Sequence, residues 1–328
     1  MNRETRILTR SDVAALLPLR ECIDAVEGAF RAHEEGRSLA PGLLSLHAEG
    51  GAFHIKAAGL TLRRNYFAAK TNGNFFHNAE RYGLPRILGT ITLCDADNGL
   101  PLAVLDSIEI TIRRTGAATA VAARHLAARG ASVATIVGCG NQGHVTVEAL
   151  LAVLPIERFL LVDVDRARAE ALAVYARSLG ARAEIHDDLA TAVAASSVCV
   201  TCTPARAAIL GRADAHPGLF IAGVGADSSE KQELDPELLA ASHVFVDHLE
   251  QCATIGDLHH AIECGVMSRE DVAGTLGQVI VGTHGRRSDD EVVIFDSTGT
   301  ALQDVAAAAI VYERSLTEGR GVVVRLDS

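Results

Sequence analysis

The chain has 328 residues, which suggests two domains, and its hydrophobic content of 48% is sufficient for sizeable cores. Its formal net charge of −11 gives no reason to expect nucleic acid or an anionic membrane as a partner. The sequence has no run of 18 apolar residues, and its seven cysteines are scattered, so we expect a protein of the reducing cytoplasm that does not span a membrane.

Three stretches in the first part of the chain have the apolar spacing of helices. Residues 11–17 predict a first helix capped by Ser11, and residues 19–36 predict a second helix that ends near Gly36. A long helix begins over residues 110–128 and leads into the next part of the chain.

Strand-like apolar runs lie between the second and third of these helices, at 51–60, 66–73 and 88–107. The last run contains DADNG at 95–99, which predicts a hairpin turn between two strands. The pattern predicts a mostly antiparallel sheet. Its apolar face and open edges would favour a homodimer.

A strand, a glycine-rich turn and a helix then follow one another. Residues 131–137 are apolar and β-branched, and residues 144–154 carry apolar side chains at helical spacing. Residues 136–143 read IVGCGNQG, with the spacing G-x-G-x-x-G. In this context the motif predicts a dinucleotide-binding loop.

The residues of this loop have separate roles. Gly138 permits the tight turn, Gly140 lets the backbone approach a pyrophosphate, and Gly143 lets helix and strand pack closely. Asn141 and Gln142 complete the loop at the helix N-terminus, where free N–H groups and the positive dipole end favour phosphates. We therefore assign all five to cofactor binding.

A second buried strand, at 158–165, ends in acidic residues. Asp163 lies about where a carboxylate meets the adenosine ribose hydroxyls, and it would repel a 2′-phosphate, so NAD is favoured over NADP. Asp165 is the alternative residue for this role, and the arginines at 166 and 168 could tolerate a phosphate.

Buried strands continue to alternate with helices, which predicts a doubly wound parallel sheet of Rossmann type. Ligands bind such sheets at the carboxyl ends of strands, where Thr203 and Asp227 are expected. The final strand, at 321–326, is expected to return to the first domain.

The expected architecture is therefore α/β, with a Rossmann-type NAD-binding domain at 126–302. This domain would be inserted into an α+β substrate-binding and dimerisation domain formed by residues 1–125 and completed by 303–328.

Seven segments in one order resemble the ornithine cyclodeaminase/mu-crystallin family: AAKTNGN, GTITLCDADNGLPLAVLDS, RRTGAATAVAA, IVGCGNQG, GADSSEKQEL, VDHLEQCATIGDLHHAI and FDSTGTALQDVAAA. The resemblance covers nearly the whole chain. It implies a dimeric architecture in which the first domains pair their sheets. The family includes cyclodeaminases, alanine dehydrogenases and imine reductases.

The resemblance also implies site residues. Lys70 matches the active-site lysine, Arg114 the arginine that grips the substrate carboxylate, and Asp227 the acid/base aspartate. Residues that fall where the family contacts the cofactor are Thr115, Thr203 and Ser297 to Gly299.

Elementary chemistry is consistent with these roles. A planar arginine fork suits a carboxylate, a nearby lysine adds charge, and an aspartate can move protons. Each residue also has a simpler interpretation: Lys70 as a solvated strand lysine, Arg114 as a helix-start salt bridge with Arg113 as its rival, and Asp227 as a loop cap.

The sequence departs from the family's pattern after Pro41, where many members carry a second carboxylate-binding arginine and this chain has none. His54 or Lys56 could supply the missing charge as a substrate-binding residue. We assign no metal site, because the adjacent His259 and His260 would face different directions on a helix.

These features predict an NAD(H)-dependent oxidoreductase that acts at the Cα–N bond of a small amino or imino acid. The first alternative is a cyclodeaminase that uses NAD catalytically, and the second is a non-catalytic ligand-binding protein.

Overall fold

A computed structural model describes residues 4–326 of the chain. Internal contacts divide it into a first unit, which runs up to Arg114 and resumes at Thr300, and a second unit, Thr115–Gly299. The first border lies within one helix, α4 (Ser107–Leu126), and precedes the border at residue 125 expected from the sequence. The outermost residues of the expected first domain, 1–3 and 327–328, lie outside the described part.

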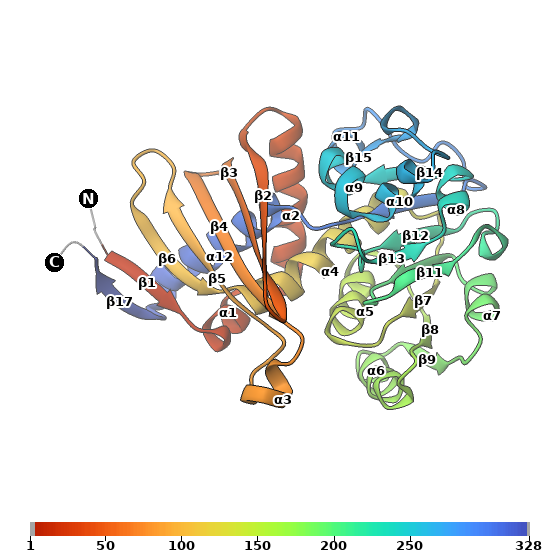
Figure 1. Cartoon of the computed structure of the whole chain (residues 1–328), viewed down its shortest axis with the longest axis horizontal. Helices are drawn as coiled ribbons and strands as arrows, with labels where there is room; N and C mark the ends of the chain where they lie inside the picture. Colours follow the sequence, from red (N-terminus) through yellow and green to blue (C-terminus); the bar gives the residue numbers. More distant parts are fainter. Residues whose placement is uncertain (1–3, 327–328) are drawn as a thin grey trace. The chain divides into compact units, whose positions relative to one another are not determined.

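The first unit contains a seven-stranded sheet in the order β17-β1-β6-β5-β4-β3-β2 (Figure 1). β1 and β6 pair in parallel, and the remaining neighbours are antiparallel, as predicted. The predicted hairpin at 95–99 joins β5 to β6. The strands are β1 (Glu4–Leu8), β2 (Ser38–Ala48), β3 (Gly51–Thr61), β4 (Asn65–Phe75), β5 (Ile87–Asp95), β6 (Pro101–Asp106) and β17 (Val322–Arg325).

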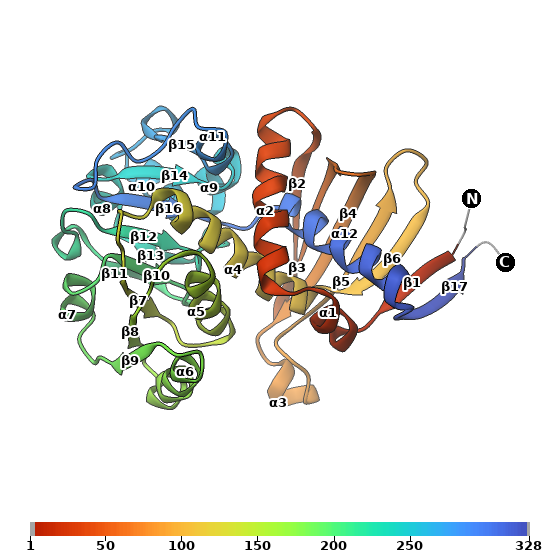
Figure 2. The same ribbon diagram turned by 180° about the vertical axis from the view of Figure 1, so that it is seen from behind.

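Helices cover one face of this sheet. Figure 2 shows α2 and α12 crossing the strands, and α12 packs on β3, β4 and α2. The first helix is capped by Thr9, not by Ser11 as expected, because Thr9, two residues earlier, forms a reciprocal capping box with Asp12. The helices of this unit are α1 (Arg10–Leu16), α2 (Leu19–Glu34), α3 (Asn78–Tyr82), the first part of α4, and α12 (Ala301–Glu318).

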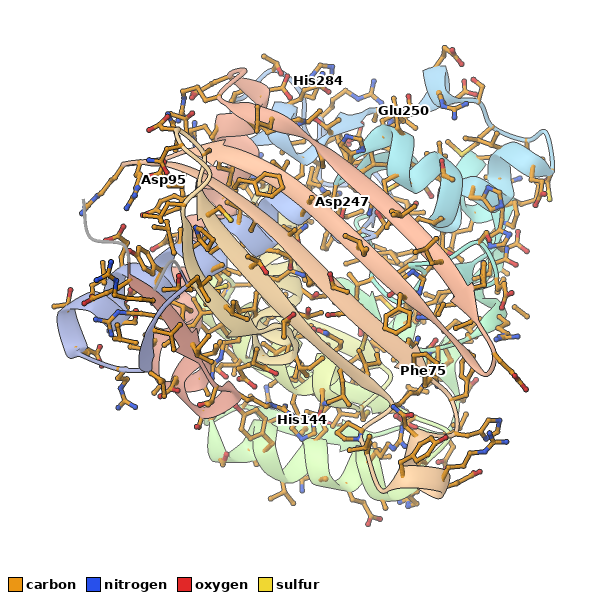
Figure 3. All side chains as sticks on the ribbon, turned by 60° about the vertical axis from the view of Figure 1, so that its left-hand side comes forward. Phe75, Asp95, His144, Asp247, Glu250 and His284 are labelled. Atoms are coloured by element: carbon orange, nitrogen blue, oxygen red, sulfur yellow. The ribbon has the colours of Figure 1, made fainter. Side chains whose placement is uncertain are left out.

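The opposite face of the sheet carries apolar side chains that this chain leaves exposed. Leu44 and Leu46 on β2 are 52% and 51% exposed, and Phe53, which lies opposite Leu46 on β3, is 42% exposed. Figure 3 looks onto this sheet with α12 behind it, and marks its two ends by Phe75 and Asp95.

The second unit contains an eight-stranded sheet in the order β15-β14-β16-β12-β10-β7-β8-β9, with every neighbouring pair parallel. The predicted doubly wound parallel sheet is therefore confirmed, and the strand order reverses between β7 and β10. The strands are β7 (Val133–Val137), β8 (Arg158–Val162), β9 (Arg182–Ile185), β10 (Val198–Thr201), β12 (Phe220–Gly223), β14 (His243–Val246), β15 (Gly274–Thr275) and β16 (Val293–Asp296).

Helices and a small second sheet complete this unit. The small sheet pairs β11 (Arg206–Leu210) with β13 (Gln232–Leu234). The α-helices are the second part of α4, α5 (Asn141–Val153), α6 (Arg166–Ser178), α7 (Leu189–Ala194), α8 (Pro236–Ala240), α9 (Leu249–Ile255), α10 (Asp257–Glu263) and α11 (Leu276–Ile280). None of the helices in residues 4–326 is long and apolar enough to cross a membrane.

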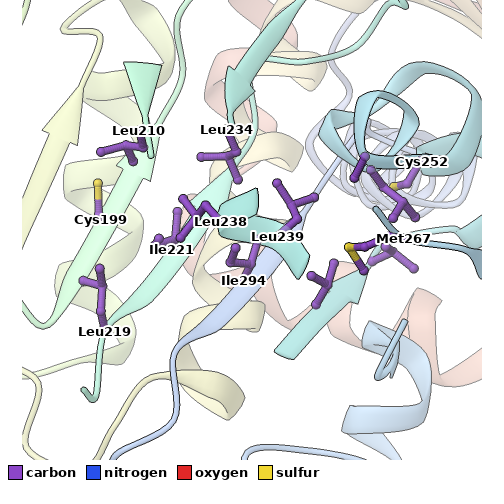
Figure 4. Packing of buried hydrophobic residues seen from close by; sticks show 14 of the residues in the cluster. Cys199, Leu210, Leu219, Ile221, Leu234, Leu238, Leu239, Cys252, Met267 and Ile294 are labelled. Carbon is purple, nitrogen blue, oxygen red and sulfur yellow. The ribbon is translucent and has the colours of Figure 1, made fainter. Parts of the chain in front are cut away.

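An apolar core joins the large sheet of the second unit to α8 (Figure 4). Leu238 and Leu239 pack with Ile221 of β12 and Ile294 of β16, all fully buried or nearly so. Burial of each such side chain contributes about 1.5–3 kcal/mol. Cys199 belongs to this core and is a free thiol, which agrees with a packing role for it.

Candidate functional site

The glycine-rich loop has the geometry of a phosphate cradle. Gly138 has a φ of 98°, a region that favours glycine, and a Cβ there would lie 2.9 Å from the Cys202 carbonyl oxygen. A Cβ on Gly143 would lie 2.4 Å from the Gly138 carbonyl oxygen, so α5 packs against the turn. A Cβ on Gly140 would meet no atom within 4 Å, so the space above this residue is open.

The N-terminus of α5 opens onto this space. Gly140 caps the helix without a side chain, so the first N–H groups receive no side-chain cap from it. Within residues 4–326, the side-chain oxygen of Gln142 is buried without a hydrogen-bond partner. An open glycine cradle with a bare helix N-terminus fits a dinucleotide pyrophosphate.

Asp163 connects the glycine loop to the end of β8. One carboxylate oxygen accepts the Cys139 N–H at 2.7 Å, and the other accepts the Asp165 N–H at 2.8 Å. Asp165 itself caps α6 through the Ala167 N–H and lies 3.2 Å from Arg168. Of the two candidate ribose ligands, Asp163 is thus placed beside the loop, while Asp165 serves the next helix.

Further candidate residues follow the carboxyl ends of strands in the second unit. Thr203 follows β10, and its N–H and hydroxyl both donate to Glu233. Asp227 follows β12, is 54% exposed at its side chain and lies 2.5 Å from the Lys231 ammonium. Asp227 is therefore accessible. Its cationic neighbour Lys231 was not predicted from the sequence.

The cofactor candidates after β16 depend on another carboxylate that the sequence interpretation missed. Asp247 accepts hydrogen bonds from the Ser297 hydroxyl at 3.0 Å and the Gly299 N–H at 2.7 Å. Asp247 follows β14, the strand beside β16, so the sheet itself brings these loops together. Thr115 lies in α4, and its carbonyl accepts the Thr119 hydroxyl.

In the first unit, three elements bring a buried charge cluster together. Lys70 of β4 lies 2.7 Å from one carboxylate oxygen of Asp304 on α12, and Nε of Arg114 on α4 lies 3.2 Å from the other. Nη1 of Arg114 also donates to the Gln303 side chain at 2.9 Å. All three charged residues are at most 6% exposed.

A third cationic residue lies beside this cluster. Lys56 of β3 lies directly opposite Lys70 in the antiparallel register and is also buried. Burial is the main cause that lowers the pKa of Lys70 to about 7. The positive charges of Arg114 and Lys56 add to this effect, while Asp304 opposes it. Lys70 can therefore gain or lose a proton near neutral pH.

His54, the other candidate on β3, contacts a residue of the neighbouring strand β2. It lies two residues before Lys56 on β3, is half-buried, and its ring nitrogen is 3.0 Å from the Ser45 hydroxyl. Arg113 pairs with Glu109 one turn away on the same helix. Arg114 and Lys56 are thus the neighbours of Lys70, and the two rival residues have other partners.

Asp304 and Gln303 were not identified from the sequence. They are a polar pair inside the alanine-rich helix α12, where both side chains are buried. The signal available was the pair itself, because an apolar helix rarely buries a carboxylate without a partner. Within the described residues, Nε2 of Gln303 is a buried donor without an acceptor.

Comparisons with known proteins show which family the chain resembles in sequence and fold. Residues 3–319 match the model of the ornithine cyclodeaminase/mu-crystallin family. The chain is 37% identical to an alanine dehydrogenase of Archaeoglobus fulgidus over 98% of both chains. It is 30% identical to an iminosuccinate reductase of Paracoccus denitrificans over 98% of this chain and 99% of that protein. Its fold matches an archaeal alanine dehydrogenase dimer solved with bound NAD, with a TM-score of 0.94, 37% identity and coverage of 98% and 99%.

Proposed function

The chain belongs to the ornithine cyclodeaminase/mu-crystallin family, and from this premise we propose that it is an NAD(H)-dependent oxidoreductase that acts at the Cα–N bond of a small amino or imino acid. In the reductive direction an imino acid gains a hydride at Cα and a proton at nitrogen, which gives an amino acid. In the oxidative direction the amino acid loses a hydride from Cα and a proton from nitrogen, which gives the imino acid. Water then hydrolyses the imino acid to the keto acid and ammonia. NAD(H), when bound, supplies or accepts the hydride.

The observation that carries this proposal is the buried cluster of Lys70, Arg114 and Asp304. Nη1 of Arg114 donates to the Gln303 side chain, whereas Nε, although near Asp304, has no hydrogen-bond partner among the described residues. The guanidinium group therefore has N–H donors for the α-carboxylate of a substrate. Gln303 offers one more buried donor. A set of donors held in advance binds a carboxylate without reorganisation.

Two groups are proposed to move protons. Lys70, with its pKa lowered to about 7, is suited to proton transfer at neutral pH. Asp227 is proposed as the acid/base group for the amine, water or ammonia, and its exposed side chain is consistent with this role.

The second unit is proposed to hold the cofactor through the glycine loop and Asp163. A carboxylate in this position favours NAD over NADP, because it binds a ribose diol and repels a phosphate. The remaining proposed contacts are Thr115, Thr203 and Ser297 to Gly299.

Lys56 is proposed as the residue that replaces the second carboxylate-binding arginine. It is buried opposite Lys70, so a substrate with a second carboxylate would find a further cation on β3. The compounds after which the two relatives are named differ in their number of carboxylates, since alanine has one and iminosuccinate has two.

We further propose a homodimer and a cytoplasmic location. The exposed apolar face of the first sheet supports the former, together with the dimeric state in which the archaeal alanine dehydrogenase was solved. The seven free cysteines support the latter.

The test follows NADH and NADPH absorbance with the purified protein and a panel of substrates. The panel contains pyruvate and oxaloacetate, each with ammonium, and ornithine with NAD⁺. We expect stoichiometric oxidation of NADH with at least one keto acid and slower oxidation of NADPH. Proline and ammonia formed from ornithine without net NADH production would establish a cyclodeaminase instead. NADH binding without turnover of any of these substrates would support the ligand-binding alternative.

A further inference from the structure

A buried carboxylate in the second unit has none of the roles described so far. Glu233 lies on β13 and is fully buried. One of its oxygens accepts the N–H and the hydroxyl of Thr203, at 2.6 and 2.7 Å. The other accepts the Thr201 hydroxyl and the Gly225 N–H, both at 2.8 Å. Each carboxylate oxygen therefore receives two hydrogen bonds.

These four contacts connect two loops at the carboxyl edge of the sheet. Thr201 ends β10 and Thr203 follows it, while Gly225 follows β12 and lies two residues before Asp227. The loops approach so closely that a Cβ on Gly225 would lie 2.3 Å from the Thr203 carbonyl oxygen and 2.6 Å from the Glu233 carboxylate. The carboxylate thus sets the spacing between the proposed cofactor contact and the loop of the proposed acid/base group.

Glu233 is itself held by a second buried carboxylate. Asp257, at the start of α10, accepts the backbone N–H groups of Glu233 and Leu234 at 2.8 and 3.0 Å. Asp296, at the end of β16, in turn accepts the Leu258 N–H at 2.9 Å. The position of Glu233 is therefore fixed from the backbone side by α10, and α10 is fixed by the sheet.

Placing two carboxylates in this interior has an electrostatic cost. Burial and the charge of Asp257 raise the pKa of Glu233 to about 7, against the effect of the hydrogen bonds that Thr203 and Thr201 donate. If this position served only core packing, an apolar residue would be favoured, because replacing a buried charge by an apolar side chain often leaves the stability of the folded protein unchanged or increases it. The retained charge is explained if the two loops must be held in one arrangement.

We propose that Glu233 is a positioning residue of the enzyme, which holds Thr203 in place for NAD binding and the 225–227 loop in place for the action of Asp227. The proposal rests on the function proposed above. Glu233 touches neither cofactor nor substrate in this scheme and acts through the two loops.

The test replaces the carboxylate while keeping its shape. In Glu233→Gln the amide nitrogen is a donor and faces two donors, so at least one loop loses its acceptors. We expect the Kd for NADH, measured by isothermal titration of the purified full chain, to rise at least about tenfold, the scale of a lost charged hydrogen bond. The kcat with the best keto acid of the panel should also fall about tenfold or more.

Two control variants separate positioning from stability. Glu230→Gln alters an exposed glutamate that pairs with Arg206 in the same segment, and it should leave the Kd and kcat within about twofold of wild type. Leu234→Val reduces core packing on the same strand, so it should lower the thermal midpoint while the folded enzyme keeps its Kd and kcat.

A double-mutant cycle gives a readout that a purely structural role would not move. If Glu233 acts through Thr203, then Thr203→Val and Glu233→Gln should be strongly non-additive in the free energy of NADH binding. Wild-type Kd and kcat in Glu233→Gln, or additive effects in the cycle, would overturn the proposal. If the wild-type protein turned over no substrate, the proposed function would fail, and the NADH cycle would still decide the role of Glu233.

Discussion

At the scale of single residues, the chemistry of the first unit depends on how one aspartate is shared between two cations. Lys56 and Lys70 face each other across antiparallel strands, a placement that is unfavourable for like charges. Asp304 lies between Lys70 and Arg114 and opposes the loss of charge on Lys70. An anion bound here, as proposed for the substrate carboxylate, would relieve the repulsion between the two lysines.

The lowered pKa of Lys70 also affects stability. Between its ordinary pKa of 10.5 and about 7, an unfolded Lys70 binds a proton that the folded one does not. The free energy of unfolding therefore decreases as the pH falls through this window, and the loss ends where the folded lysine also becomes protonated.

A pair of substitutions tests this electrostatic arrangement. We expect the pH profile of kcat/KM to contain an ionisation near pH 7 from Lys70. Asp304→Asn removes the charge that raises this pKa, so the ionisation should move to lower pH. Lys56→Met removes a charge that lowers the pKa of Lys70, so the ionisation should move to higher pH. Shifts of both variants in the same direction would show that another group produces the ionisation.

Lys56→Met carries a second expectation about specificity. If Lys56 binds a second carboxylate, the variant should lose about tenfold or more of kcat/KM for oxaloacetate with ammonium, and much less for pyruvate with ammonium. Equal losses for both substrates would contradict a role in side-chain recognition.

The family resemblance predicted Lys70 and Arg114 as site residues, whereas neither Asp304 nor Glu233 was predicted. Family motifs mark residues one at a time, whereas the partners of these residues are set by tertiary contacts. Residues 70, 114 and 304 are far apart in the chain, and only the packing of α12 on β4 brings them together. Nothing in local spacing could have predicted that three elements would share one carboxylate.

At the scale of elements, local signals were more informative. The strand, glycine turn and helix around Gly140 were predicted because each depends on neighbouring residues, and they occur as β7, the loop and α5. The first helix shows the limit of such signals. Thr9 and Ser11 are both good caps, and the capping box with Asp12 decides for Thr9.

Two glycines of the loop should respond differently to alanine. A Cβ at position 143 would meet the backbone of Gly138, so Gly143→Ala should lower the free energy of unfolding by about 1–3 kcal/mol as well as weaken NADH binding. A Cβ at position 140 meets nothing within 4 Å, so Gly140→Ala should keep its stability and lose NADH affinity, because the methyl group occupies the proposed pyrophosphate space. Thermal unfolding without ligand and NADH titration measure the two effects. Gly140→Ala with wild-type affinity would contradict the proposed location of the pyrophosphate.

At the scale of the whole molecule, the topology explains why the glycine loop comes so late in the sequence. The last strand, β17, returns to pair with β1, as the sequence predicted for the end of the chain. The strands β1 and β17 thus belong to one sheet, and the second unit is inserted between the first part of α4 and α12. Within the described part of the first unit, helices cover only one face of the sheet.

That uncovered face leads to the last prediction. Its exposed apolar residues include Leu44, Leu46 and Phe53, and such a patch on a sheet is expected to be buried by another molecule. We expect light scattering at micromolar concentration to give about twice the chain mass of 34.5 kDa. Phe53→Asp, which would bury a charge in the interface, should shift the protein towards the mass of one chain. Val174→Asp alters an apolar residue on α6 of the second unit that is more exposed than Phe53, so it should leave the mass unchanged. A wild-type mass of one chain would contradict the homodimer, and a Phe53→Asp variant that stays dimeric would show that the two chains do not associate through this face.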